Sequence, residues 1–330
     1  MATATYMEAG RDALAEEMRR DPLVWAVGED LGRGGVFGQY KGLVEEFGSE
    51  RISDAPISEA AILGAAVGAA MMGTRPVVEM RFSDFALCAM DELVNQAAKA
   101  RFMFGGQTRV PLVVREPIGM WRSSAAQHSQ SLEAWYAHVP GLVVVCPSTP
   151  ADTKGLLKTA IRSDDPVVFM EHKNLWGLSG EVPDGEHLVP FGEARIVRPG
   201  TDVTIVSWSA QVHVAAEAAE ALAAEGIEVE LIDLRTLWPW DKARVLASVE
   251  KTGRLLVTHE SVAVAGFGAE VAATVAEHLG PHLKAPVRRL GSPRALIAYA
   301  PPVENALRVT AQATADVVKV LLRPLGGRRI

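Results

Sequence analysis

Residues 51–73 of this 330-residue chain read RISDAPISEAAILGAAVGAAMMG, a short strand, a turn containing proline, one carboxylate and a helix. Ser58 suits the helix N-cap, and Glu59 then lies in the first turn, where the helix dipole favours negative charge. The residues that follow offer no polar face, so we expect this helix to be buried on all sides. An unpaired buried carboxylate is strongly unfavourable, and Glu59 should therefore have a dedicated partner.

The sequence around this stretch is typical of an α/β protein with two domains in tandem. Runs rich in β-branched residues, such as 75–80 and 111–116, alternate with amphipathic helices. Such runs indicate mainly parallel strands that helices cover on both faces. A stretch rich in Gly, Pro and charged residues then interrupts the pattern. We predict a first domain over 1–176, a linker over 177–194 and a smaller second domain over 195–330.

The composition argues against several classes of partner. A net charge of −7 leaves no broad basic surface for a nucleic acid, and the apolar run after Glu59 is too short to span a membrane. Cys88 and Cys146 lie in apolar stretches and are expected to be reduced core residues. The N-terminal residues form an amphipathic helix pattern without an apolar signal core. We expect a cytoplasmic protein with no nucleic-acid or membrane partner.

Common catalytic motifs do not account for the chain. The run Gly266-Phe267-Gly268 lacks the third glycine and the acidic residue of a dinucleotide-binding motif, so a tight strand-to-helix turn explains it better. The sequence has no HExxH motif, no Cys–His cluster and no GxSxG nucleophile elbow. Hydrolase and NAD-dependent dehydrogenase functions are therefore disfavoured.

Two further side chains are candidates for chemistry. His128 lies in a polar segment between two buried strands, a position where open α/β sheets place ligands. Its imidazole would exchange protons near neutral pH, although a lone loop histidine is more often simply exposed. Phe85 is either a core aromatic or a stacking platform, and taken alone the core interpretation is favoured.

Four motifs in this order resemble the β subunit of the thiamine-diphosphate-dependent decarboxylating component of 2-oxoacid dehydrogenase complexes: ISDAPISE (52–59), FSDFA (82–86), AAQHSQS (125–131) and DLRTLWPWD (233–241). The resemblance covers essentially the whole chain and extends, more distantly, to the second half of transketolases. It implies a transketolase-like pyrimidine-binding domain and a transketolase C-terminal-like domain. It also implies an α2β2 heterotetramer with thiamine diphosphate between α and β subunits. Mg²⁺ is expected on the α subunit, and no GDG motif for it occurs here.

The resemblance also implies roles for individual residues. Glu59 matches the glutamate that hydrogen-bonds the pyrimidine ring nitrogen of the cofactor, and Ile57 and Phe85 match residues that pack on that ring. His128 matches a histidine near the reacting carbon, which serves proton steps or the acylation of lipoamide. Glu29 matches a carboxylate of an acidic tunnel that links the two active sites in some members.

Three positions, in two sites, depart from the family's pattern. A further tunnel carboxylate is replaced here by Cys88. Some relatives also bind a structural K⁺ through backbone carbonyls, and the matching positions are Leu112, Ala160, Ile161, Ser163 and Asp165. The last two differ from the usual Asp and Asn.

The resemblance predicts an oxidoreductase β subunit, active only with its α subunit. The enzyme would decarboxylate a 2-oxoacid, or cleave acetoin, and transfer the acyl group to lipoamide on a lipoyl acyltransferase core. The run QAAKARFMFGGQ (96–107) looks nearest to acetoin-type members. Two alternatives to this prediction stay open. The first is that the chain is half of a split transketolase or related carboligase, and the second is that it is a non-catalytic subunit on the same fold.

Overall fold

Buried, β-branched strands build the sheet of the first lobe. In the computed structural model, which describes residues 2–323, this sheet has seven strands in the order β12-β6-β7-β5-β4-β2-β3. All neighbours pair in parallel except β12 and β6, which are antiparallel. The strands are β2 (Val24–Gly28), β3 (Ile52–Asp54), β4 (Arg75–Glu79), β5 (Val113–Ile118), β6 (Val143–Val145), β7 (Val167–His172) and β12 (Thr236–Trp238).

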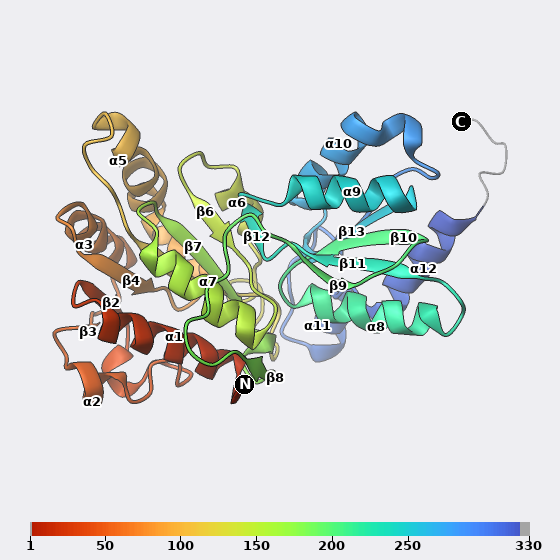
Figure 1. Ribbon diagram of the computed structural model, residues 1–330. Coiled ribbons are helices and arrows are strands. Elements are labelled where there is room, and N and C mark those ends of the chain that lie inside the picture. The colour runs from red at the N-terminus through yellow and green to blue at the C-terminus, as the bar shows by residue number, and fades with distance from the viewer. Residues whose placement is uncertain (1, 324–330) are drawn as a thin grey trace.

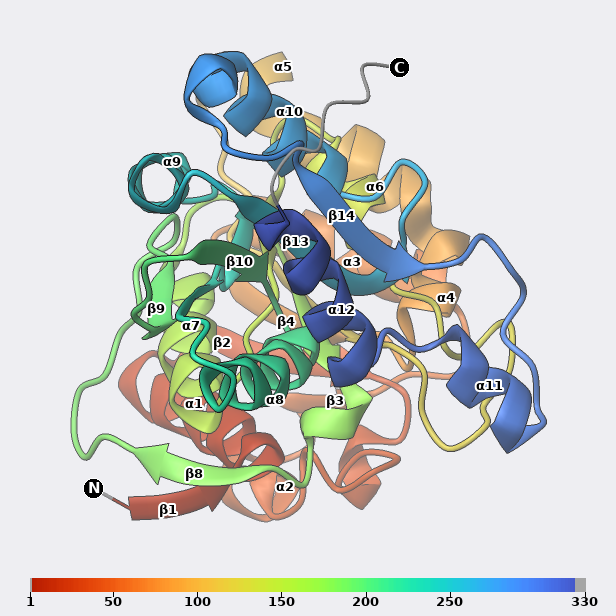
Figure 2. The ribbon, with the colours of Figure 1, turned by 90° about the vertical axis from the view of Figure 1, so that its right-hand side faces the viewer.

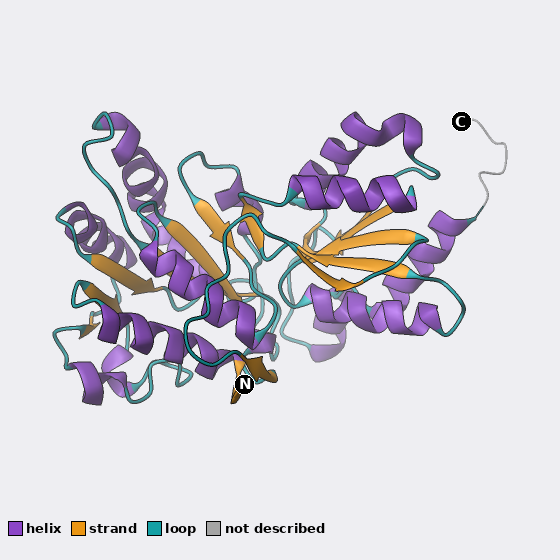
Figure 3. Ribbon diagram, in the orientation of Figure 1, coloured by secondary structure: helices purple, strands orange, loops and turns teal. Residues whose placement is uncertain are grey.

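Helices cover both faces of this sheet (Figure 3). Alternate residues of the strands point to opposite faces, so Val113 packs with α1 (Tyr6–Arg20) and α7 (Pro150–Arg162). Val114 packs on the other side with α3 (Glu59–Met71). The remaining helices of the lobe are α2 (Leu43–Phe47), α4 (Ser83–Ala86), α5 (Ala98–Met103) and α6 (Glu133–Ala137), with a π-helical stretch (Asp91–Ala97) leading into α5.

The second lobe repeats this arrangement on a smaller scale. Within the described residues its sheet has five strands in the order β14-β13-β10-β11-β9, parallel except for β9. Its strands are β9 (Arg195–Arg198), β10 (Val203–Ser207), β11 (Val229–Asp233), β13 (Leu255–Val262) and β14 (Arg288–Ser292). The helices are α8 (Gln211–Ala223), α9 (Lys242–Thr252), α10 (Gly268–Leu279), α11 (Pro301–Leu307) and α12 (Ala311–Leu322) (Figure 2). The predicted α/β class with mainly parallel sheets is confirmed.

The two lobes lie side by side (Figure 1). Two short strands, β8 (Ser179–Val182) and β12, also pair with segments that are distant in the sequence. β8 lies in the stretch predicted as a linker and pairs antiparallel with β1 (Ala2–Thr5). β12, which lies within the motif DLRTLWPWD (233–241), adds an edge strand to the first sheet. One apolar cluster also contains side chains of both lobes, including Tyr136 and Trp208. The lobes are therefore packed against each other over a shared core.

Helix α3 corrects the prediction of a helix buried on all sides. One face is buried, with Ile62, Leu63, Ala66, Val67 and Ala70. The opposite face is exposed, with Ala60, Ala61, Ala65 and Gly68. Because Ala and Gly carry little polarity, the exposed face looked apolar in the sequence. Ser58 occupies the N-cap position, but its Oγ donates to the carbonyl of Pro56 (2.9 Å) and caps no helical N–H.

Two smaller findings concern the cysteines and membrane spans. Cys88, predicted to be a core residue, is exposed at the helical turn that follows α4, whereas Cys146 is buried. Both are free thiols, as predicted. Within residues 2–323, no helix combines the length and apolar character that crossing a membrane requires.

Candidate active site

The carboxyl ends of β2, β3 and β4 lie level with one another. Gly28, the last residue of β2, pairs with Asp54 on one side and Glu79 on the other. A side chain at Gly28 does not fit, because a Cβ would lie 2.8 Å from the carbonyl oxygen of Glu79. Glu29 follows directly, so its side chain emerges at the same edge as the loop before Glu59 and the helix that carries Phe85. This is where parallel sheets place their ligands.

An aromatic cluster forms beside this edge. The segment 119–132, which follows β5, brings His128 against two phenylalanines. The ring centroid of His128 lies 5.1 Å from those of Phe82 and Phe85, in edge-to-face arrangements. The two phenylalanine rings lie 5.6 Å apart. The structure thus brings the predicted residues Phe85 and His128 together, and it adds Phe82, which the sequence did not single out.

Glu29 lies in an acidic corner of the edge. It is 8% exposed, and Arg81 Nη1 lies 3.4 Å from its Oε2 and 3.6 Å from Asp30 Oδ2. Burial raises the pKa of the Glu29 carboxyl, Arg81 opposes this, and the negative charges of Glu59 and Asp30 raise it further. The Glu59 carboxylate is therefore near enough to Glu29 for its negative charge to act on the Glu29 carboxyl.

Glu59 and Ile57 remain available to a ligand or a partner chain. Glu59 is half-buried at the start of α3, and its carboxylate has no hydrogen-bond partner among residues 2–323. Ile57, in the preceding turn, is 74% exposed. A half-buried unpaired carboxylate beside an exposed apolar side chain is what a site completed by another molecule would present.

Lys173 is a part of the site that the sequence analysis missed. It is 1% exposed, and its Nζ donates to the backbone carbonyl of His128 and lies 4.6 Å from the ring centroid of Phe82. Burial lowers the pKa of this amine to about 8, although Asp84 and Glu260 oppose the shift. A lysine directly after the apolar strand β7 was the available signal, because such a position lies at the ligand edge of the sheet.

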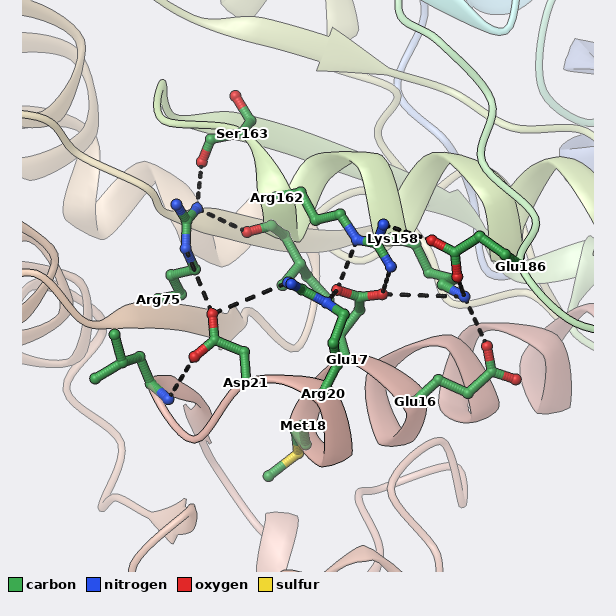
Figure 4. A network of polar contacts seen from close by, with 12 residues as sticks. Glu16, Glu17, Met18, Arg20, Asp21, Arg75, Lys158, Arg162, Ser163 and Glu186 are labelled. Atoms are coloured by element: carbon green, nitrogen blue, oxygen red, sulfur yellow. Dashed lines mark hydrogen bonds and ion pairs between the residues drawn. The ribbon is translucent and has the colours of Figure 1, made fainter.

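The residues that the resemblance assigned to K⁺ lie just before β5 and between the last turn of α7 and the start of β7, and Figure 4 shows Arg75 beside one of them, Ser163. Arg75 Nη1 donates to the carbonyls of Ile161 (3.1 Å) and Ser163 (2.9 Å), and its Nη2 pairs with Asp164 (2.9 Å). The carbonyls of Leu112 and Ala160 also accept backbone N–H groups. These oxygens therefore do not fit a K⁺ ion while Arg75 is in place.

Comparisons with known proteins agree with this architecture. Residues 2–177 match the family "Transketolase, pyrimidine binding domain", and residues 192–314 match "Transketolase, C-terminal domain". A split-gene transketolase, described as an inactive beta4 tetramer, has a TM-score of 0.77 at 22% identity. The alignment covers 96% of this chain and 97% of that one, so the two share a fold.

Sequence relatives are more specific. The chain is 48% identical to the acetoin:2,6-dichlorophenolindophenol oxidoreductase subunit beta of Cupriavidus necator, over 89% of this chain and 90% of that protein. It is 43% identical to the 2-oxoisovalerate dehydrogenase subunit beta of Bacillus subtilis, over 98% and 99% of the two chains. It is 44% identical to the pyruvate dehydrogenase E1 component subunit beta of Rhizobium meliloti, over 97% and 70%. The chain therefore belongs to the transketolase-like family of E1 β subunits of 2-oxoacid and acetoin dehydrogenase complexes.

Proposed function

We propose that this chain is the β half of a thiamine-diphosphate enzyme that decarboxylates a 2-oxoacid or cleaves acetoin. The observation that carries the proposal is the Glu59 carboxylate, which is half-buried at the ligand edge of the sheet and has no hydrogen-bond partner within residues 2–323. A protonated ring nitrogen of a pyrimidine is a partner that such a carboxylate would bind strongly. The cofactor, when bound, supplies the electron sink for carbon–carbon cleavage.

The chain's own residues would then have distinct tasks. Glu59 would hold a proton at the ring nitrogen, while Ile57 and Phe85 would pack on the ring. His128, edge-on to Phe85, would give or take a proton at the reacting carbon or at lipoamide. Glu29, whose pKa is raised, would keep a proton more readily than an ordinary carboxyl group and so serve as a local proton store.

The chain requires partners for this activity. We propose an α subunit in an α2β2 heterotetramer, which would supply Mg²⁺ and the diphosphate site, and a lipoyl acyltransferase core that accepts the acyl group. The exposed Ala and Gly face of α3 supports a closely packed partner chain. Phe102, Met103 and Phe104, consecutive and exposed at the end of α5, support one as well.

The test is co-expression with an α subunit of this enzyme family from the same organism. The purified assembly is assayed with pyruvate, branched-chain 2-oxoacids and acetoin, using lipoamide and an artificial dye as acceptors. We expect thiamine-diphosphate-dependent turnover of at least one of these substrates. Turnover of ketose and aldehyde pairs alone would favour a split transketolase. Failure of the assembly to bind the cofactor in calorimetry would favour a non-catalytic subunit.

A further inference from the structure

The base of the segment that carries His128 is held at one residue, Met120, through both its backbone N–H and its backbone carbonyl. Its N–H donates to Glu260 Oε1 (2.7 Å). Its carbonyl accepts from Asn174 Nδ2 and from Arg308 Nη2, both at 2.9 Å. Glu260 lies on β13 and Arg308 directly follows α11, so both belong to the second lobe. Figure 2 shows the segment, in yellow, beside α11.

Glu260 is the centre of this contact. Besides the N–H of Met120, its Oε1 binds His172 Nε2 (2.9 Å), and its Oε2 lies 3.5 Å from Arg308 Nη1. The N–H of Asn174 donates to His172 Nδ1 (3.2 Å), which leaves the proton of the neutral imidazole on Nε2, facing the carboxylate. Burial would raise the pKa of Glu260, but His172, the Met120 N–H and Arg308 together lower it, so the carboxylate is ionised at neutral pH.

The segment needs such support, because its backbone is strained. Arg122, Ser123 and Ala125 have φ values of 48°, 58° and 64°, in the left-handed region that is unfavourable for residues other than glycine. Each costs on the order of 1 kcal/mol. Gly119, at φ 91°, leaves no space for a side chain, because a Cβ would lie 2.0 Å from His172 Nε2. Contacts outside the segment therefore add to the hydrogen bonds within it, such as that from the N–H of Gly119 to the carbonyl of Gln130, in maintaining its conformation.

The contacts at Met120 are linked to His128 through consecutive residues at the end of β7 and in the turn after it. His172 binds Glu260, and the next residue, Lys173, donates to the carbonyl of His128. Asn174 then binds the Met120 carbonyl. Three consecutive residues of the first lobe thus connect the second-lobe carboxylate to both the base and the tip of the segment.

We propose that Glu260 and Arg308 are positioning residues: by fixing the backbone N–H and carbonyl of Met120, they hold segment 119–132 so that His128 faces Phe82 and Phe85. The second lobe thereby supports the active site of the first. A shift of the lobes relative to each other would displace His128. The catalytic consequence rests on the function proposed above, whereas the structural hold does not.

The test uses the co-expressed assembly with four variants. Glu260→Ala removes every contact of the carboxylate. Glu260→Gln keeps an oxygen for Met120 but directs an NH₂ group toward Arg308, so it should have an intermediate effect. Arg308→Met removes one of the two donors to the Met120 carbonyl, and it tests the proposal independently if the Glu260 variants do not fold. The matched control is Glu230→Gln, because Glu230 is also buried in the second lobe, accepts a backbone N–H from Gly200 and pairs with Lys251.

Three readouts separate the structural and catalytic parts of the proposal. Arg122 is exposed and is the one tryptic site in segment 119–132, so the rate of trypsin cleavage after it reports the mobility of the segment. Hydrogen exchange of the Met120 amide reports the same hold directly. In kinetics, a displaced His128 should lower kcat on the order of 100-fold in Glu260→Ala, with KM and cofactor affinity nearly unchanged.

The outcomes distinguish this proposal from the proposed function. We expect faster cleavage, faster exchange and lower kcat in Glu260→Ala and Arg308→Met, with Glu260→Gln between them and the wild type, and Glu230→Gln unaffected. Unchanged cleavage and exchange in Glu260→Ala would overturn the proposal whatever the activity. A mobile segment with normal kcat would refute the positioning role. If the wild-type assembly lacks turnover, the proposed function fails, while cleavage and exchange still decide whether Glu260 holds the segment.

Discussion

Glu116 should make the stability of this protein depend on pH, and Glu116→Gln should remove that dependence. Glu116 lies on β5 with a fully buried side chain, next to Arg115, whose guanidinium points to the other face and binds Glu171 through two bonds of 2.9 Å. Ser83 and Tyr136 lie near the Glu116 carboxyl and lower its pKa slightly, but neither makes a hydrogen bond of ordinary geometry with it. Burial dominates and raises the pKa from 4.5 to about 8.

The sign and size of the effect follow from linkage. Between pH 4.5 and about 8 the unfolded chain releases the Glu116 proton while the folded chain keeps it, so the free energy of unfolding falls as the pH rises through this window. The loss amounts to roughly 3 kcal/mol at neutral pH. A glutamine has the same shape and no charge, so Glu116→Gln should be more stable than the wild type at pH 8 and similar to it near pH 4.5.

Urea unfolding of both proteins, followed by tryptophan fluorescence at pH 5 and pH 8, measures this difference. Groups common to both proteins cancel in the comparison. Glu171→Gln is the matched control, and its effect on the free energy of unfolding should have the opposite sign. It breaks the buried ion pair with Arg115 and should destabilise the folded protein by about 3–5 kcal/mol. Equal pH dependence in the wild type and Glu116→Gln would refute the reasoning.

Three further predictions concern other parts of the chain. His259 is buried, its Nε2 has no hydrogen-bond partner in the described part of the chain, and burial lowers its pKa to about 4. The unfolded chain therefore binds a proton first as the pH falls below 6.5, and the free energy of unfolding should drop by about 3 kcal/mol by pH 4. His259→Phe should lack this drop in acid-range urea titrations. Because Arg75 occupies the carbonyls of Ile161 and Ser163, exchanging KCl for choline chloride should leave the Tm of the assembly unchanged, and a rise specific to K⁺ would contradict this. Phe85→Ala should weaken thiamine diphosphate binding in calorimetry by about fivefold, or about 1 kcal/mol, and unchanged affinity would exclude a stacking role.

The sequence predicted the parts of the fold that depend on local pattern. Continuous β-branched runs identified the buried parallel strands, because only strands covered on both faces can be apolar on both. It missed β8 and β12, which are short and form only by pairing with distant segments. It also misjudged α3, because Ala and Gly occur equally on buried and exposed faces.

The candidate site was predicted through motifs and completed by tertiary contacts. The motifs indicated Glu59, Phe85 and His128, which follow three different strands of the first sheet, and the structure brings Phe85 and His128 into contact. Lys173 and Glu260 carried no motif, and their importance depends on side-chain contacts across the fold. The role of Arg75 likewise arises from carbonyls some ninety positions along the chain, which no local pattern indicates.

The most direct test of the central claim is the turnover of the α–β assembly carrying Glu59→Gln. Glutamine keeps the size of the side chain and removes the charge that the pyrimidine nitrogen requires. Size-exclusion chromatography should show normal assembly, and Glu50→Gln, at an exposed glutamate outside the site, should retain wild-type activity. We predict that turnover in Glu59→Gln falls by about 100-fold or more. A rate close to that of the wild type would contradict the account.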